Sequence, residues 1–170
     1  MIVVEEREYA RLLGYPWGTL LEGLEGEVRE RAAQATAWYE EHGKPRVYCT
    51  GEVAGITAGG EVDAEVARLW DEGRVDESYF LDRYAAAVVE KMARELGPHA
   101  SPGCSSKLPF EEQFTLFARL SVLKPEMEML SSGMLKPKNS LLALVYPNGD
   151  APANPCTACN MPNCSFRRRS

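Results

Sequence analysis

The chain has 170 residues, of which 45% are hydrophobic and 26% charged, and its net charge at pH 7 is -6. This length fits one domain with a substantial core, and the composition is that of a globular protein in water. The acidic balance argues against nucleic acid as a partner, because binding to phosphates requires a basic face. No apolar run is long enough for a membrane span, and the acidic start is unlike a secretory leader. These features predict a cytoplasmic protein.

The N-terminal part is predicted to be helical. A short helix is expected over residues 5–14, because Tyr9, Leu12 and Leu13 lie at helical spacing. Apolar residues three or four positions apart then predict a long amphipathic helix over residues 19–42, for which Thr19 is a suitable N-cap.

The middle of the chain combines strands and helices. Residues 46–50 and 52–57 are typical of two neighbouring strands. A short helix is expected over residues 62–70, and a longer one over residues 78–96, with Ser78 as its cap.

The last part of the core begins with a helix near Pro109, a residue that is favourable at the first helical position. The face of that helix expected to be buried consists of Phe110, Phe114, Phe117 and Leu120. Residues 127–131 alternate weakly like a strand, and the unbroken apolar run Leu141–Tyr146 predicts an interior strand. Because helices and strands do not alternate regularly, we expect an α+β fold with a mixed or antiparallel sheet.

Cysteines mark the end of the sequence. Cys156, Cys159 and Cys164 have the spacing C-x2-C-x4-C, which can bring three thiolates to one metal ion or iron–sulfur cluster. A redox-active pair of thiols and a tail of unligated thiols are the alternatives. A fourth ligand could come from a set of three other residues, Cys49, Cys104 and His99. We therefore divide the chain into a core domain, 1–147, and a cysteine-rich tail, 148–170.

Three motifs occur in a characteristic order: Ser101-Pro102-Gly103-Cys104, then Pro109–Gln113 opening a helix, then Ser132-Gly133-Met134 followed by Pro137 and Ser140. This order resembles the activation domain of cobalamin-dependent methionine synthase, and in particular shortened stand-alone relatives with a cysteine-rich end. The resemblance is clearest over residues 78–146.

The resemblance implies an α+β fold with a twisted antiparallel sheet. It implies a shallow groove for S-adenosylmethionine, which is presented to a cobalamin on a neighbouring domain or protein. One electron and the methyl group then restore an inactive cobalamin, and the activation domain supplies binding and orientation. It also implies a corrinoid protein as partner and an electron donor. Whether the chain is an enzyme in its own right, or an accessory module of a methyltransferase, is left open at this point.

The resemblance also assigns ligand-binding positions. By position in the motif, the residues that would contact S-adenosylmethionine are His99, Ser101, Pro102, Gly103 and Cys104. His99 stands where the family motif has an arginine, and Cys104 where it usually has a tyrosine. Gly103 would allow the ligand to approach the backbone closely.

Two other functions fit the same residues. One is an iron–sulfur or zinc protein for electron transfer or sensing, built on the same fold and without S-adenosylmethionine. The other is a domain for small-molecule binding whose cysteine tail holds a structural zinc ion.

Overall fold

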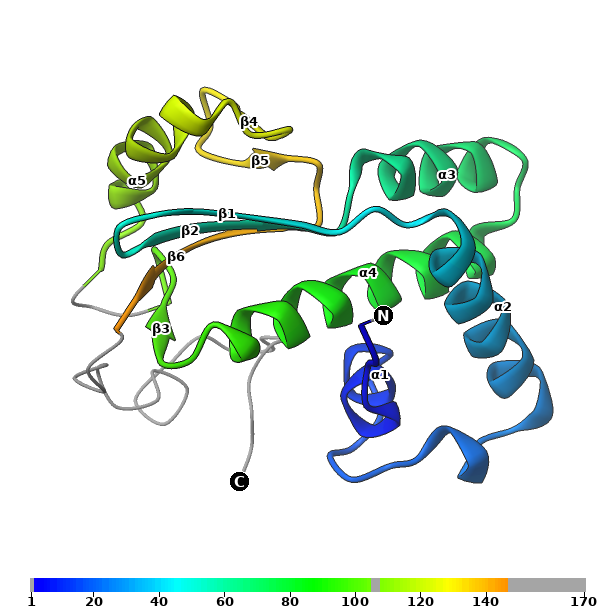
Figure 1. Ribbon diagram of the computed structural model, residues 1–170. Coiled ribbons are helices and arrows are strands. Elements are labelled where there is room, and N and C mark those ends of the chain that lie inside the picture. Colours follow the sequence, from blue (N-terminus) through cyan, green and yellow to red (C-terminus); the bar gives the residue numbers. More distant parts are fainter. Residues whose placement is uncertain (1, 105–107, 147–170) are drawn as a thin grey trace.

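The computed structural model describes residues 2–104 and 108–146. Its centre is an antiparallel sheet in the order β1-β2-β6-β3 (Figure 1). The four strands are β1 (Arg46–Thr50), β2 (Val53–Thr57), β3 (His99–Ala100) and β6 (Ser140–Val145). Because β6 pairs with both β2 and β3, it lies in the interior of the sheet, as its apolar run predicts. The α+β class with an antiparallel sheet is confirmed.

The longest helix, α4 (Val75–Glu95), lies along one face of this sheet (Figure 1). Three further helices pack against α4: α1 (Glu6–Leu12), α2 (Gly26–His42) and α3 (Gly60–Asp71). We expected the second helix to pack on the sheet, but α2 packs chiefly on α4. It reaches the end of the sheet through Tyr39, whose hydroxyl donates a hydrogen bond to Ala58 O at 2.8 Å. None of the helices in the described ranges is both long enough and apolar enough to cross a membrane.

The opposite face of the sheet is covered by a second layer (Figure 1). This layer contains α5 (Glu112–Leu120), η2 (Ser121–Leu123) and the hairpin of β4 (Glu128–Met129) and β5 (Leu135–Lys136). Its core joins Val53 and Leu142 of the sheet to Leu116 and Leu120 of α5. The layers are in close contact at Gly55, where an added Cβ atom would lie 2.3 Å from Leu120 Cδ2.

Two predicted helix starts are wrong. The chain does not enter a continuous helix at Thr19; it forms a single turn, η1 (Leu21–Gly23), passes through the extended residue Leu24 and begins α2 at Gly26. Glycine is a weak helix former, so the glycines flanking this extended step explain why the apolar spacing did not produce one helix. Ser78 does not cap α4 but lies inside it, where its hydroxyl donates to Val66 O at 3.0 Å.

The predicted buried face of the fifth helix is confirmed at Leu120 and, in part, at Phe117, but it is wrong at Phe110 and Phe114. Helix α5 starts at Glu112, so Pro109 precedes it. Leu116 and Leu120 are the residues it buries, and the exposed fractions of Phe110 and Phe114 are 44% and 43%. A helix presents only one stripe to a flat sheet, and here that stripe is aliphatic.

Candidate functional site

The Ser101–Cys104 segment forms a tight turn directly after β3. The Cys104 N–H donates to Ser101 O at 3.1 Å, which closes the turn. Pro102 occupies its second position and Gly103 its third, with a φ of +78°. This combination is the one that a type II turn requires. Ser101 and Pro102 are buried, while Gly103 and the Cys104 thiol face the surface.

The backbone and the ring of His99 are both held by neighbouring residues. It pairs with Val145 of β6, and its Nδ1 lies 2.9 Å from Gly97 O. Because a carbonyl oxygen only accepts, Nδ1 carries the proton in this contact, and in the neutral ring Nε2 is the acceptor. The ring is partly exposed. His99 thus offers one acceptor nitrogen beside the turn. The arginine of the family motif that it resembles would instead offer a positive charge and several N–H donors.

Phe110 connects the turn with the β4–β5 hairpin. A Cβ atom added at Gly103 would lie 3.6 Å from Phe110 Cδ2, and one added at Gly133 would lie 2.7 Å from Phe110 Cε1. Gln113 holds the hairpin loop in place by donating to Gly133 O. The turn and the Ser132–Met134 loop therefore meet at a ring of the Pro109–Gln113 motif, so all three predicted motifs lie together here.

The rings next to this contact form an apolar patch on the surface. Phe110, Phe114 and Met134 make up what we call the aromatic patch, with exposed fractions of 44%, 43% and 60%. Exposed apolar clusters of this kind are typical of contact sites on soluble proteins. The patch was not predicted, because both phenylalanines are hydrophobic enough for the core and were expected there.

The end of the third motif, residues 137–140, is fixed by a residue that was not predicted to have a role. Asp82 of α4 is buried, and its carboxylate contacts Lys138 Nζ at 2.9 Å, Asn139 Nδ2 at 3.0 Å and Arg83 Nη2 at 2.6 Å. Burial disfavours the charged form, but these donors hold the pKa of Asp82 below its ordinary value. The Lys138 N–H also donates to Asp63 Oδ2 at 2.7 Å. The sequence does carry a signal for this contact: Asp82 is an acidic residue on the face of an amphipathic helix that is expected to be buried, and a buried carboxylate needs partners.

No residue of the turn lines either of two cavities, of about 510 and 330 Å³, that occur in the described part of the chain. The expected groove between the turn and residues 134–140 therefore stays a prediction. The expected metal ligands Cys156, Cys159 and Cys164 lie outside the described residues. Within residues 2–104 and 108–146, no three His, Cys, Asp or Glu side chains are placed to hold a metal ion.

No protein-family model and no curated protein matches this sequence. A solved structure does match: the MetH reactivation domain crystallised with bound AdoHcy, at a TM-score of 0.64. The alignment covers 88% of this chain and 76% of that chain, with 12% of residues identical. The fold is that of the MetH reactivation domain.

At this level of identity, the similarity to the MetH reactivation domain establishes the architecture and not the ligand. It agrees with the independent order of motifs in residues 78–146, which resembles the same domain. In this chain those motifs lie in the turn after β3, at the start of α5, and in the hairpin and loop that lead into β6.

Proposed function

We propose that this chain is a reactivation module for a corrinoid protein. It would bind S-adenosylmethionine at the turn after β3 and present its methyl group to a cobalamin held by a separate protein, related to methionine synthase. The fold shared with a MetH reactivation domain that binds AdoHcy is the observation that carries this proposal. AdoHcy is the product that remains when S-adenosylmethionine gives up its methyl group, so a site for one recognises most of the other.

The turn supports this proposal in part. Gly103 and Cys104 face outward, and a glycine in that place leaves room for a ligand against the backbone. Two of the turn's N–H groups are already used, since Gly103 N–H donates to Leu108 O and Cys104 N–H to Ser101 O. Recognition would therefore rely on carbonyl oxygens, on the His99 ring and on the aromatic patch, which can stack with an adenine ring.

The reaction assigned to the partner requires one electron and one methyl group. The electron comes from a separate one-electron donor and reduces Co(II), and the methyl cation equivalent comes from the sulfonium. The products are methyl-cobalt(III) and AdoHcy. The residues of this chain would bind and orient the sulfonium, and the proposal gives them no covalent role. In this sense the chain is an accessory module of a methyltransferase.

Calorimetric titration of the full chain with S-adenosylmethionine and with AdoHcy tests the proposal. We expect saturable binding of both. The variants His99→Arg and Cys104→Tyr introduce the residues of the family motif and should bind more tightly. For His99→Arg we expect an increase in affinity of roughly tenfold, because the guanidinium adds charged hydrogen bonds. His42→Arg, which alters the other histidine, should change nothing. A folded protein that gives no heat at millimolar ligand, in the wild type and in both restored variants, would contradict the proposed role.

The cysteine tail gives this proposal a second part. We propose that Cys156, Cys159 and Cys164 bind one zinc ion or iron–sulfur cluster, on the basis of their spacing. A cluster there would suit a module that needs an electron delivered near a cobalamin. Zinc would instead make the tail structural. The metal content of the purified protein decides between them.

A further inference from the structure

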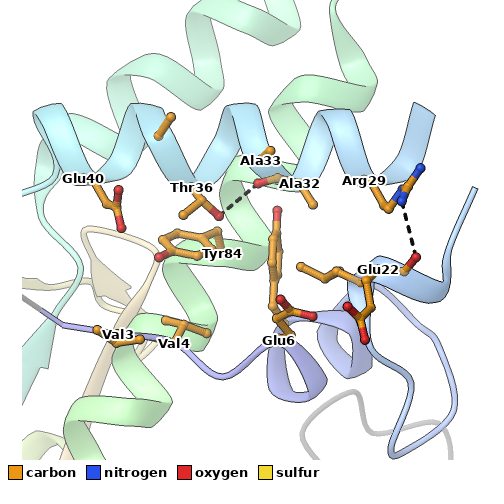
Figure 2. Close-up of a pocket in the computed structure, with 13 residues that line it drawn as sticks. Val3, Val4, Glu6, Glu22, Arg29, Ala32, Ala33, Thr36, Glu40 and Tyr84 are labelled. Carbon is orange, nitrogen blue, oxygen red and sulfur yellow. Dashed lines mark hydrogen bonds between the residues drawn. The ribbon is translucent and has the colours of Figure 1, made fainter. Parts of the chain in front are cut away.

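The larger of the two cavities is a groove among the helices, lined by residues of the N-terminal segment, α1, η1, α2 and α4. Its volume is about 510 Å³, within the range of sites for small organic molecules. Figure 2 shows it between α2 and the N-terminal segment that leads into α1, with Tyr84 of α4 at its base. Tyr84 lies near the middle of α4, whereas β3 follows the C-terminal end of that helix (Figure 1). The groove is therefore built by other elements than the turn.

The base of the groove is apolar and aromatic. Tyr9 and Tyr84 are buried and meet edge to face, with ring centroids 5.1 Å apart. The Tyr9 hydroxyl is used within the core, where it donates to Phe80 O at 2.8 Å. Six further apolar residues line the groove: Val3, Val4, Leu21, Ala32, Ala33 and Ala37. This surface suits the apolar body of a ligand.

The rim of the groove is negatively charged. Three carboxylates line it, Glu6 from α1, Glu22 from η1 and Glu40 from α2, against one guanidinium, Arg29. The net charge of the lining is thus -2, and Arg29 is directed to the Glu22 carbonyl oxygen at 3.4 Å. Figure 2 shows Glu40 beside Tyr84 at one end, and Glu6 and Glu22 toward η1.

Glu40 and Tyr84 act together at one end of the groove. Burial and the Glu40 carboxylate raise the pKa of Tyr84, so its phenol is neutral at pH 7 and does not repel an anion or attract a cation by a charge of its own. A cation placed between that ring and Glu40 would gain both a charge pair and a cation–π contact. An anion would meet repulsion from three carboxylates.

We infer that this groove is a second ligand site, which takes a small organic cation: a primary or quaternary ammonium group carried on an aromatic or aliphatic body. The apolar body lies on Val4, Leu21 and Ala33, above the buried rings of Tyr9 and Tyr84, and the cationic group lies next to Glu40. This inference is independent of the proposed function, because no residue of the turn lines the groove.

Three probes with the same phenylethyl body separate charge from hydrophobicity: 2-phenylethylammonium, 2-phenylethanol and 3-phenylpropionate. Each is titrated into the full chain, and binding is followed by the NMR signals of the Val4 and Ala32 methyl groups. We expect 2-phenylethylammonium to shift these signals and to bind at least about tenfold more tightly than 3-phenylpropionate. Equal affinity for all three probes, or no shift in a folded protein, would overturn the inference.

Matched variants of α2 locate the site. Glu40→Gln should weaken binding of the ammonium by about threefold, the range of an exposed ion pair, and Glu41→Gln outside the groove should not. Ala33→Trp should fill the groove and abolish binding, whereas Gln34→Trp should leave it unchanged. Equal effects within either pair would refute the assignment. If S-adenosylmethionine shifts the same methyl signals, the groove is the methyl-donor site and the inference of a second site is wrong.

Discussion

The Oδ1 atom of Asp82 accepts a hydrogen bond from the side-chain amide of Asn139 at 3.0 Å, across 57 positions of the chain. The same buried carboxylate binds Lys138, so one side chain of α4 fixes the loop that leads into β6. Asp82→Ala would leave these donors without their acceptor. We expect a loss of about 3 kcal/mol in the free energy of unfolding, measured with urea. The exposed Asp71→Ala serves as control, and equal stabilities of the two variants would contradict this role.

The Asp82 contact also predicts a pH dependence. The pKa of Asp82 is lower in the folded state than its ordinary value of 3.8. Such a group stabilises the fold at pH values above 3.8 and loses this effect as the pH falls toward its folded value. The difference in unfolding free energy between wild type and Asp82→Asn should therefore be full at pH 6 and shrink below about pH 4. A difference that stays constant from pH 6 to pH 3 would contradict the prediction.

The contact between Gly55 and Leu120 predicts a size-dependent pair of substitutions. Because an added Cβ at Gly55 would lie 2.3 Å from Leu120 Cδ2, Gly55→Ala should destabilise the protein by about 2 kcal/mol. Leu120→Ala alone leaves a cavity and should cost about 3 kcal/mol. Combined, the two changes should cost less than the sum of the single effects, as measured by a double-mutant cycle. Strict additivity would show that the sheet and α5 do not touch here.

Gly103 should tolerate substitutions according to their backbone preference. Its φ of +78° disfavours most side chains, while an added Cβ would only make an ordinary 3.6 Å contact with Phe110. Gly103→Val should therefore destabilise the turn by about 1–2 kcal/mol, and Gly103→Asn by clearly less. Thermal unfolding of both variants tests this. If valine and asparagine have the same effect, packing and not backbone strain governs the position.

The cysteine tail predicts a metal content that can be measured directly. We expect about one zinc ion, or the iron of one cluster, per chain after anaerobic purification, and its loss in Cys159→Ser. Thr157→Ala, which changes the same segment without removing a thiol, should retain the metal. An absorption band that bleaches with dithionite would identify the cluster. Equal, negligible zinc and iron in wild type and Cys159→Ser would leave a tail of thiols.

The strands were the most predictable part of this fold. The run from Leu141 to Tyr146 has no polar residue, and such a strand is stable only with cover on both faces, so its interior place followed from composition. The helix starts were less predictable. Around Leu24, apolar spacing fits both a continuous helix and a single turn followed by an extended step. The glycines at positions 23 and 26, which are weak helix formers, favour the extended step.

The candidate site required contacts that no local pattern reveals. Phe110 and Phe114 are hydrophobic enough for a core, and only the position of Gly133, from a later hairpin, shows that their rings lie over it at the surface. The groove beside Tyr84 is assembled from α1, η1, α2 and α4, so its charge could not be seen in any one segment. The Ser101–Cys104 turn was predictable, because proline and glycine at adjacent positions restrict the backbone locally.

The order of the strands, β1-β2-β6-β3, has a consequence for the time course of folding. The strand that joins β2 to β3 is the last of the four to be synthesised, at residues 140–145. Until then β3 has no neighbour in the sheet, and β2 has only β1. During synthesis at roughly 5–20 residues per second, the layer of α1 to α4 can therefore form seconds before the sheet closes. A ribosome-bound chain should gain protease resistance in two steps, and the second should require the arrival of β6.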